Sequence, residues 1–409
     1  MKKIELLAPA GDLEKLKIAV DYGADAVYFG GELFSLRSGA GNLDLEEIDE
    51  GLAYAHDRGA RCYLALNIFP HNEDIAPLIE YIKAIREKDI DAYIVSDPGI
   101  LAILKEMDPD RELHLSTQAN ATNYMTAGFW YRQGVRRVVL ARELTLQEIT
   151  ELRQKIPEDM EMEAFVHGAM CISYSGRCLL SNFMIERDAN RGQCAHPCRW
   201  KYALVEEKRP GEFYPVEEDG RGTYILNSRD LCMIEHIPEL AASGISSFKI
   251  EGRMKSIFYV ATIVGAYRKA IDAYEKDPGS YVFDNNWLTE LKKASHREFT
   301  TGFYFNKPTN KDQNYQTSAY TREYSFIGIV KEYDDKTGYA IVEQRNKMGI
   351  GEEIEVFGPH TQPFTQILRE MYDEEGNPVV SAPHPQQILR IKMDSPVAKN
   401  YMLRKRQDY

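Results

Sequence analysis

The sequence predicts an α/β protein with a TIM-like (β/α)8 barrel and a small C-terminal antiparallel β-barrel or sandwich. Two observations predict the barrel: eight short β-type runs fall within the first 255 residues, and segments with helical spacing separate nearly all of them. Such alternation indicates parallel βαβ units, and eight units are typical of a closed barrel. A third observation predicts the second domain, because alternating apolar positions and turn residues replace this pattern near residue 320.

The barrel elements are justified by their apolar spacing, taken in chain order. Short runs of mostly apolar residues predict strands at 4–11, 24–31, 61–69, 91–97, 111–120, 135–143, 160–168 and 246–254. Apolar residues at helical spacing predict helices at 12–23, 44–59, 74–89, 99–107, 122–134, 145–156 and 257–277. An open doubly wound sheet is the alternative architecture. No G-x-G-x-x-G follows the first strand, so dinucleotide binding has no support.

The domain boundaries follow from these elements and from changes in composition. The barrel takes residues 1–305, with a cysteine-bearing insertion at about 168–235. A polar linker follows at 306–322, and the C-terminal β domain takes 323–409. Within that domain, D-D-K-T-G and G-I-G mark turns between alternating segments.

The composition of the 409-residue chain is that of an ordinary globular protein, with 44% hydrophobic residues and a net charge of −13. No apolar run reaches the roughly 18 residues that span a bilayer, and the start lacks the apolar region of a signal peptide. We therefore expect a cytoplasmic protein without membrane contact. The negative charge argues against nucleic-acid binding through the whole surface.

A local basic segment stands out against this acidic background. Residues 171–201 carry an excess of three positive charges. Scattered arginines on a solvated surface are the simpler interpretation, and contact with RNA is the functional one. The candidate RNA-binding residues are Arg177, Arg187, Arg191 and Arg199.

Polar side chains end almost every predicted barrel strand. Single polar strand ends are common, since they cap helices or face solvent, but the set describes a pocket for an oxygen-rich or anionic small molecule. The candidate substrate-binding residues are Asn67, Ser116, Gln118, Asn120, Arg142 and Arg253, of which the two arginines would clamp carboxylates. His167 and Glu251 are the candidate catalytic residues. His167 is equally consistent with a base, a metal ligand or a capping histidine.

Four of the six cysteines fall within residues 163–202, and Cys62 and Cys232 lie outside that stretch. Six thiols are too sparse for a disulfide scaffold, whereas thiolates suit zinc or an iron–sulfur cluster. Only the C-x3-C pair of Cys194 and Cys198 has the tight spacing of a zinc staple. The spacing thus leaves zinc and iron–sulfur open, with thiol catalysis or inert burial as alternatives. Cys62, inside an apolar strand, is expected in the core.

Several motifs together resemble one family over essentially the whole chain. They are EAFVHGAMCISYSGRCLLS, ELLAPAGDLEKLKIAVDYGADAVYFGG, STQANATN, GQCAHPCRWKY, NSRDLC, KIEGRMKS and GYAIVEQRNKMGIGEEIEVFGP. The chain is similar to the peptidase U-32 family of collagenase-like proteins, and most similar to its tRNA-hydroxylating branch.

This resemblance implies a barrel with a C-terminal β domain and a role in converting the wobble uridine of tRNA to 5-hydroxyuridine. It implies prephenate as a required metabolite, tRNA as a partner, and a paralogous protein as a further expected partner. It also implies a [4Fe–4S] cluster on Cys171, Cys178, Cys194 and Cys232, with Cys198 as a fifth candidate.

Two other functions stay open. The first is a collagenase-like protease of the same family. The sequence contains no H-E-x-x-H and no G-x-S-x-G motif, which leaves a cysteine nucleophile paired with His167 or His196 as the form that such a protease would take. The second is a non-catalytic RNA-binding protein held together by zinc.

Overall fold

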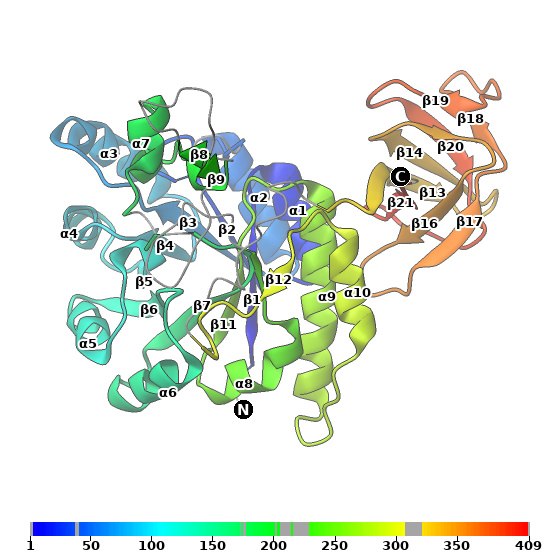
Figure 1. The fold of residues 1–409 in the computed structure, drawn as a ribbon. Helices are drawn as coiled ribbons and strands as arrows, with labels where there is room; N and C mark the ends of the chain where they lie inside the picture. Colours follow the sequence, from blue (N-terminus) through cyan, green and yellow to red (C-terminus); the bar gives the residue numbers. More distant parts are fainter. Residues whose placement is uncertain are drawn as a thin grey trace.

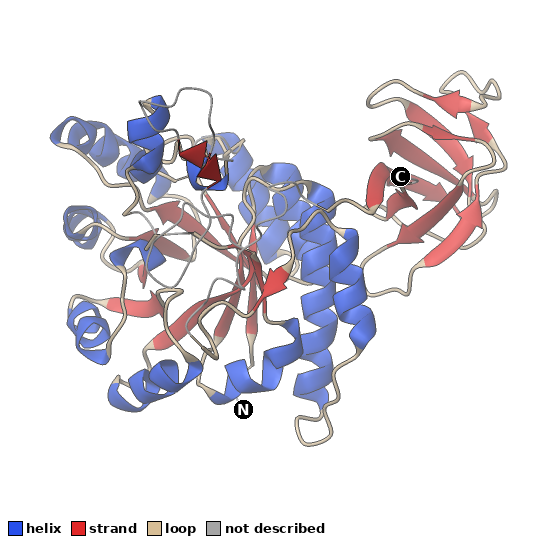
Figure 2. Ribbon diagram, in the orientation of Figure 1, coloured by secondary structure: helices blue, strands red, loops and turns tan. Residues whose placement is uncertain are grey.

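The computed structural model describes residues 3–36, 41–171, 173–174, 177–200, 203–204, 214–215, 229–306 and 321–407. The N-terminal part forms a ring of strands surrounded by helices, and the C-terminal part forms a separate β domain beside α9 and α10 (Figure 1 and Figure 2). None of the helices in these ranges combines the length and the apolar character needed to cross a membrane.

Eight parallel strands close into a barrel, as predicted. They are β1 (Glu5–Pro9), β2 (Ala26–Phe29), β3 (Arg61–Leu66), β4 (Ala92–Val95), β5 (Glu112–Leu115), β6 (Val135–Val139), β7 (Glu161–Ala169) and β11 (Ser247–Ile250). β11 pairs in parallel with both β1 and β7, so the sheet has no open edge there. The closed (β/α)8 prediction is confirmed over the open sheet.

Seven helices pack around the barrel close to their predicted positions, six of them between successive strands and α9 after β11. They are α1 (Leu13–Asp21), α2 (Leu45–His56), α3 (Asn72–Ile85), α4 (Pro98–Met107), α5 (Tyr124–Arg132), α6 (Leu146–Lys155) and α9 (Ile257–Lys276). Side-chain N-caps fix several starts: Asp12, Asp97 and Thr145 each accept a hydrogen bond from the first turn of their helix. The short α8 (Ile237–Ala242) and α10 (Asn285–Lys293) were not predicted.

The insertion lies over the carboxyl end of the barrel. Its described elements are α7 (Leu180–Ile185), η2 (Ala189–Arg191), η3 (Pro197–Arg199), β8 (Ala203–Leu204), β9 (Tyr214–Pro215) and β10 (Asp230–Cys232). β10 pairs antiparallel with the end of β7 and in parallel with β12 (Phe299–Thr300). Most of the predicted linker, 306–322, falls outside the described residues.

The amino end of the barrel interior is ionic rather than apolar. Arg137 of β6 is 1% exposed and bonds the carboxylates of Glu5, Glu161 and Glu163. Glu163 also accepts a hydrogen bond from Lys249 Nζ at 2.6 Å. Buried charges are tolerated only when partnered, so these bonds restrict how β1, β6, β7 and β11 can be arranged.

The C-terminal domain is an antiparallel sheet with two further short strands, which confirms its prediction. The seven-stranded sheet has the order β17 (Phe364–Ile367), β16 (Glu353–Phe357), β21 (Met402–Arg406), β13 (Tyr324–Asp334), β14 (Tyr339–Gln344), β20 (Ile388–Lys392), β18 (Met371–Tyr372). β15 (Met348–Gly349) pairs separately with β19 (Ser381–Ala382).

A buried arginine joins the two domains. Arg404 of β21 is 0% exposed and forms salt bridges to Glu290 of α10 and Glu355 of β16. Its guanidinium lies 4.2 Å from the ring centroid of Phe357. Phe258 of α9 stacks on Phe326 of β13 at 5.6 Å between centroids. Packing and charge together hold the β domain against the barrel helices.

We expect Glu5→Gln to destabilise the protein and to alter its acid unfolding. Burial would raise the pKa of Glu5, but the charges of Arg137 and Arg61 overcome this and hold it at about 2, against an ordinary value of 4.5. A carboxyl whose pKa is lowered by folding stabilises the fold above its ordinary pKa, and that stabilisation is lost as the pH falls toward the folded pKa. The lost contribution at neutral pH is about 3 kcal/mol.

Urea unfolding at a series of pH values measures both effects. The wild type should lose stability between pH 4.5 and about 2 more steeply than Glu5→Gln. Glu50→Gln is the control, because Glu50 is exposed and pairs only at the surface with Lys17. Equal free energies of unfolding for Glu5→Gln and wild type at neutral pH would contradict the stabilisation that we assign to the ion pairs of Glu5.

Candidate functional site

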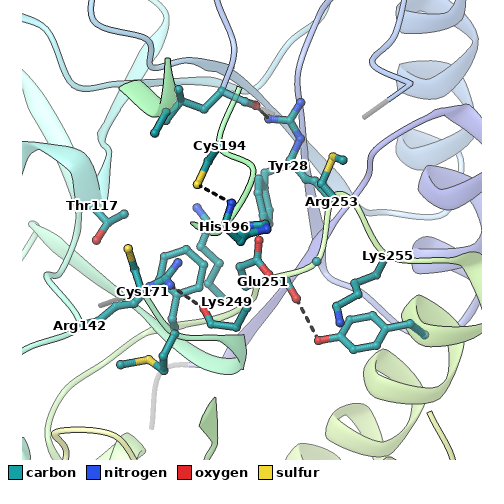
Figure 3. A pocket seen from close by; sticks show the side chains of 18 of the residues that line it. Tyr28, Thr117, Arg142, Cys171, Cys194, His196, Lys249, Glu251, Arg253 and Lys255 are labelled. Atoms are coloured by element: carbon teal, nitrogen blue, oxygen red, sulfur yellow. Dashed lines mark hydrogen bonds between the residues drawn. The ribbon is translucent and has the colours of Figure 1, made fainter. Parts of the chain in front are cut away.

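A cavity of about 660 Å³ opens at the carboxyl ends of the barrel strands. Inward-facing residues of the strands form its floor, namely Tyr28, Ala65, Ile94, Val139, Phe165 and Lys249. The insertion and the C-terminal domain form its walls. Figure 3 shows Arg142, Cys171, Lys249 and Glu251 converging on this space. Ligand sites of (β/α)8 barrels lie at this end of the strands.

Most of the predicted substrate-binding residues line the cavity. Asn67 Nδ2 donates to Ser116 Oγ at 3.3 Å, and Ser116 Oγ donates to Gln118 Oε1 at 3.3 Å. These three side chains therefore form a connected polar wall across the ends of β3 and β5. Asn120 does not line the cavity; it adopts the left-handed conformation after η1 (Thr117–Ala119) and donates to Gln118 O at 2.9 Å.

The two predicted arginine clamps have different surroundings, although both line the cavity. Arg253 donates to Ser35 Oγ and Leu36 O, each at 2.7 Å, and to Asn42 Oδ1. The guanidinium also packs closely on Gly30, where a Cβ would lie 2.1 Å from Arg253 Nη2. Arg253 thus anchors the loop after β2.

Arg142 is better placed to meet a ligand. Its Nη1 donates to Ala169 O at 2.8 Å, and its guanidinium lies 3.9 Å from the ring centroid of Phe165. Its Nε is buried without a hydrogen-bond partner among the described residues. The structure therefore favours Arg142 over Arg253 as a carboxylate clamp.

The two candidate catalytic residues lie on different sides of the cavity wall. Glu251 lines the cavity, whereas His167 does not. His167 is 1% exposed and packs against Tyr259, Tyr267 and Phe299. Burial, with the charges of Lys255 and His296, lowers the pKa of His167 to about 3. It is therefore a neutral core histidine at physiological pH, and Glu251 is the better-placed acid or base.

The cysteines separate into a cavity group and a core group. Cys171, Cys178, Cys194 and Cys198 all line the cavity. Cys232 is 7% exposed and lies opposite His167 in the β7–β10 pairing. Within the described ranges, no three His, Cys, Asp or Glu side chains come close enough to hold a metal ion. Three of the four predicted ligands thus share one cavity with Cys198, and Cys232 does not join them.

The buried position of Cys62 in β3 agrees with the prediction that it belongs to the core.

The predicted RNA-binding arginines differ in their exposure and in their partners. Arg177 and Arg187 are exposed, whereas Arg191 forms a 2.9 Å salt bridge to Asp74 that ties the insertion to α3. The side chain of Arg199 lies outside the described part of the chain.

Exposed aromatic side chains accompany these arginines. Phe183 of α7 is 84% exposed, and Tyr174 and Trp200 of the same insertion are exposed as well. Aromatic faces beside cationic groups are typical of surfaces that bind unpaired bases.

Lys249 is one of the polar strand ends that predict the pocket, but it was not among the predicted substrate-binding residues; the structure places it at the cavity floor. Burial lowers the pKa of Lys249, while the charge and hydrogen bond of Glu163 oppose this. A lysine among the apolar residues of the last barrel strand was the available signal. The rim residues that follow the barrel in the sequence, including Arg322, Tyr324 and Gln407, carried no signal, since only the folded chain brings them to the cavity.

These observations define a (β/α)8-barrel protein whose cavity, at the carboxyl ends of the strands, is lined by thiols and by cationic groups. Comparison with known families identifies it further. The family model described as peptidase family U32 matches residues 11–314, and that of the peptidase family U32 C-terminal domain matches residues 322–404. The chain belongs to peptidase family U32, which confirms the resemblance seen in its motifs.

Relatives match nearly the whole chain. It is 45% identical over 404 residues to tRNA hydroxylation protein P1 of Bacillus subtilis strain 168, which covers 99% of this chain and 95% of the relative. It is 37% identical over 444 residues to tRNA hydroxylation protein P of Escherichia coli strain K12, covering 98% and 96%. A collagenase of Porphyromonas gingivalis strain W83 is 33% identical over 378 residues, covering 90% and 89%.

We expect alkylation of the native, metal-free protein to separate the cysteines into two groups. Thiolates are the reactive form, and burial raises the pKa of Cys232 to about 12. Iodoacetamide should therefore modify exposed Cys171 first and the other cavity thiols next, with Cys62 and Cys232 protected. Peptide mass spectrometry over time measures this order. The control is urea-denatured protein, in which all six should react; alkylation of native Cys232 as fast as Cys171 would contradict its core position.

Proposed function

We propose that the protein hydroxylates the wobble uridine of tRNA to 5-hydroxyuridine, uses prephenate, and carries a [4Fe–4S] cluster. The observation that carries this proposal is the end-to-end similarity to proteins named for tRNA hydroxylation. A cavity at the strand ends, bordered by exposed aromatic residues and arginines, supports it from the structure.

The rim of the cavity suits an anticodon loop. RNA is read mostly at unpaired bases that stack on aromatic or guanidinium faces. Phe183 and Trp200 offer such faces, and the exposed Arg177 and Arg187 offer charge for phosphates. A wobble base that leaves the loop would reach the cavity between the insertion and the C-terminal domain.

The charges of the cavity suit a small organic dianion such as prephenate. Its lining includes Arg142, Lys249, Lys255 and Arg322, against the single described carboxylate of Glu251. Cationic groups that line a cavity attract anions more strongly than the same groups in open solvent. We assign proton transfer to Glu251 rather than to His167, because Glu251 alone of the two faces the cavity.

Thiolates are suitable ligands for an iron–sulfur cluster, and three of the four predicted ligands lie in one cavity. Cys171, Cys178 and Cys194 line the cavity that would receive the base. We propose Cys232 as the fourth ligand; Cys198, which already lines the cavity, is the alternative. Such a cluster supplies one-electron chemistry when bound. A paralogous partner protein stays a prediction.

We expect anaerobically reconstituted protein to hold about four irons per chain, as a Cys₄-bound cluster requires. Cys171→Ala and Cys178→Ala should lose the iron and the visible absorption. Comparison of Cys232→Ala with Cys198→Ala identifies the fourth ligand, because only the ligand variant should lose iron. Cys62→Ala is the control, since Cys62 lies in β3 away from the cavity. Reconstituted wild-type protein without iron would remove the cluster from the proposal.

We expect a deletion strain to lack 5-hydroxyuridine in its tRNA and the wild-type gene to restore it. Glu251→Gln should restore about a hundredfold less product, if this carboxylate transfers a proton. Mass spectrometry of digested tRNA measures the nucleoside. Unchanged 5-hydroxyuridine in the deletion strain would refute the tRNA assignment. Peptide cleavage by iron-free protein that is lost in Cys171→Ala would instead favour the protease hypothesis.

A further inference from the structure

We infer that the cavity floor is a carboxylate site in which Lys249 is the central cation and Arg142 and Gln118 are the accompanying donors. The inference rests on the proposed function and deepens it, because it specifies which atoms hold the acidic metabolite. It also replaces Arg253 by Lys249 in the pair of clamps that the sequence suggested.

Lys249 is presented to the cavity from the last barrel strand. It is 4% exposed, and its Nζ lies 4.3 Å from the ring centroid of Tyr28 and 5.5 Å from that of Phe165. In the described part of the chain, Glu163 is its one hydrogen-bond acceptor. An ammonium has three donors, so a ligand oxygen can bind without displacing Glu163.

Lys249 and Arg142 bring two cationic groups to the cavity floor. Glu163 accepts the hydrogen bond of Lys249 and also pairs with Arg137, whose charge Glu5 and Glu161 balance as well. Arg142 stands nearby, since its guanidinium and Lys249 Nζ lie 3.9 Å and 5.5 Å from the centroid of the same Phe165 ring. The Arg142 guanidinium donates to Ala169 O, and the Glu143 carboxylate is close enough to interact with its charge. Among the described residues that line the cavity, cationic side chains outnumber the one carboxylate of Glu251, so an anion would balance the charge.

Two further donors at the same place lack partners among the described residues. Gln118 is 2% exposed and lines the cavity, and its buried Nε2 has no hydrogen-bond partner in that part of the chain. The same holds for the buried Nε of Arg142. Buried donors are normally hydrogen-bonded, so unpartnered ones in a cavity wall point to a ligand. An ionised carboxylate accepts only, which matches a wall made of donors.

The rest of the floor indicates the body of this ligand. Tyr28, Ala65, Ile94 and Val139 present ring and aliphatic surface to the cavity. A site with one charged corner and apolar neighbours suits an organic acid with an unsaturated ring or chain, and suits inorganic phosphate poorly.

Arg253 holds a loop in place and is not one of the donors that we assign to the carboxylate. Three hydrogen bonds to Ser35, Leu36 and Asn42 fix its guanidinium on the loop after β2. Its removal would loosen that loop, and any change in binding would be indirect.

Calorimetric titration of the full-length protein with prephenate tests the site. Loss of one charge-assisted hydrogen bond should raise Kd about ten- to a hundredfold in Lys249→Met. Gln118→Leu should raise Kd about three- to tenfold. This variant leaves no buried charge without a partner, so it still tests the site if Lys249→Met does not fold. Lys249→Arg should retain part of the affinity. Lys293→Met is the matched control, because Lys293 also pairs with a carboxylate but lies outside the cavity.

The outcomes separate this inference from the proposed function. Equal Kd for wild type, Lys249→Met and Gln118→Leu would overturn the site, even if tRNA hydroxylation is confirmed. Phosphate binding as tight as prephenate binding would overturn the assignment of an organic acid. Weakened prephenate binding in both variants with unchanged 5-hydroxyuridine in the deletion strain would support the site and refute the tRNA function.

Discussion

One guanidinium inside the barrel ties together the strands that close the sheet. Arg137 of β6 bonds Glu5 of β1 and Glu163 of β7, and Glu163 bonds Lys249 of β11. Because buried charges need partners in a defined geometry, these bonds set which side chains of the four strands face inward. The same set of bonds holds the Lys249 ammonium at the floor of the cavity. The stability of the barrel and the chemistry of its site therefore share residues.

The fold was predictable from the sequence because its elements are locally encoded. The apolar runs of the eight strands and the helical spacing between them each span enough residues to be recognised. The six-residue α8 was missed because it is too short to show a helical period, and α10 because it lies beyond the strand–helix alternation on which the prediction depends. The ends of strands were also overestimated: the segment 111–120 is a strand only over Glu112–Leu115, after which Ser116 caps a 3-10 turn.

The site was predictable where it depends on strand ends, and unpredictable where it depends on long-range contacts. Gln118, Arg142 and Glu251 reach the cavity because barrel strands all end on one face. Arg253 and Arg191 have the same side chain as Arg142, yet Asn42 and Asp74, from distant segments, bind them. Position in the sequence also does not reveal that Cys232 packs beside His167 in the core.

Direct pairing of β7 with β11 means that the barrel closes without help from the insertion that separates them along the chain. The closed sheet and the insertion that walls the cavity are thus separate parts of the structure. A change in the length or the thiols of the insertion therefore does not by itself break the pairing that closes the sheet. Such modularity offers a physical reason why one family can include proteins named for tRNA hydroxylation and for collagen cleavage.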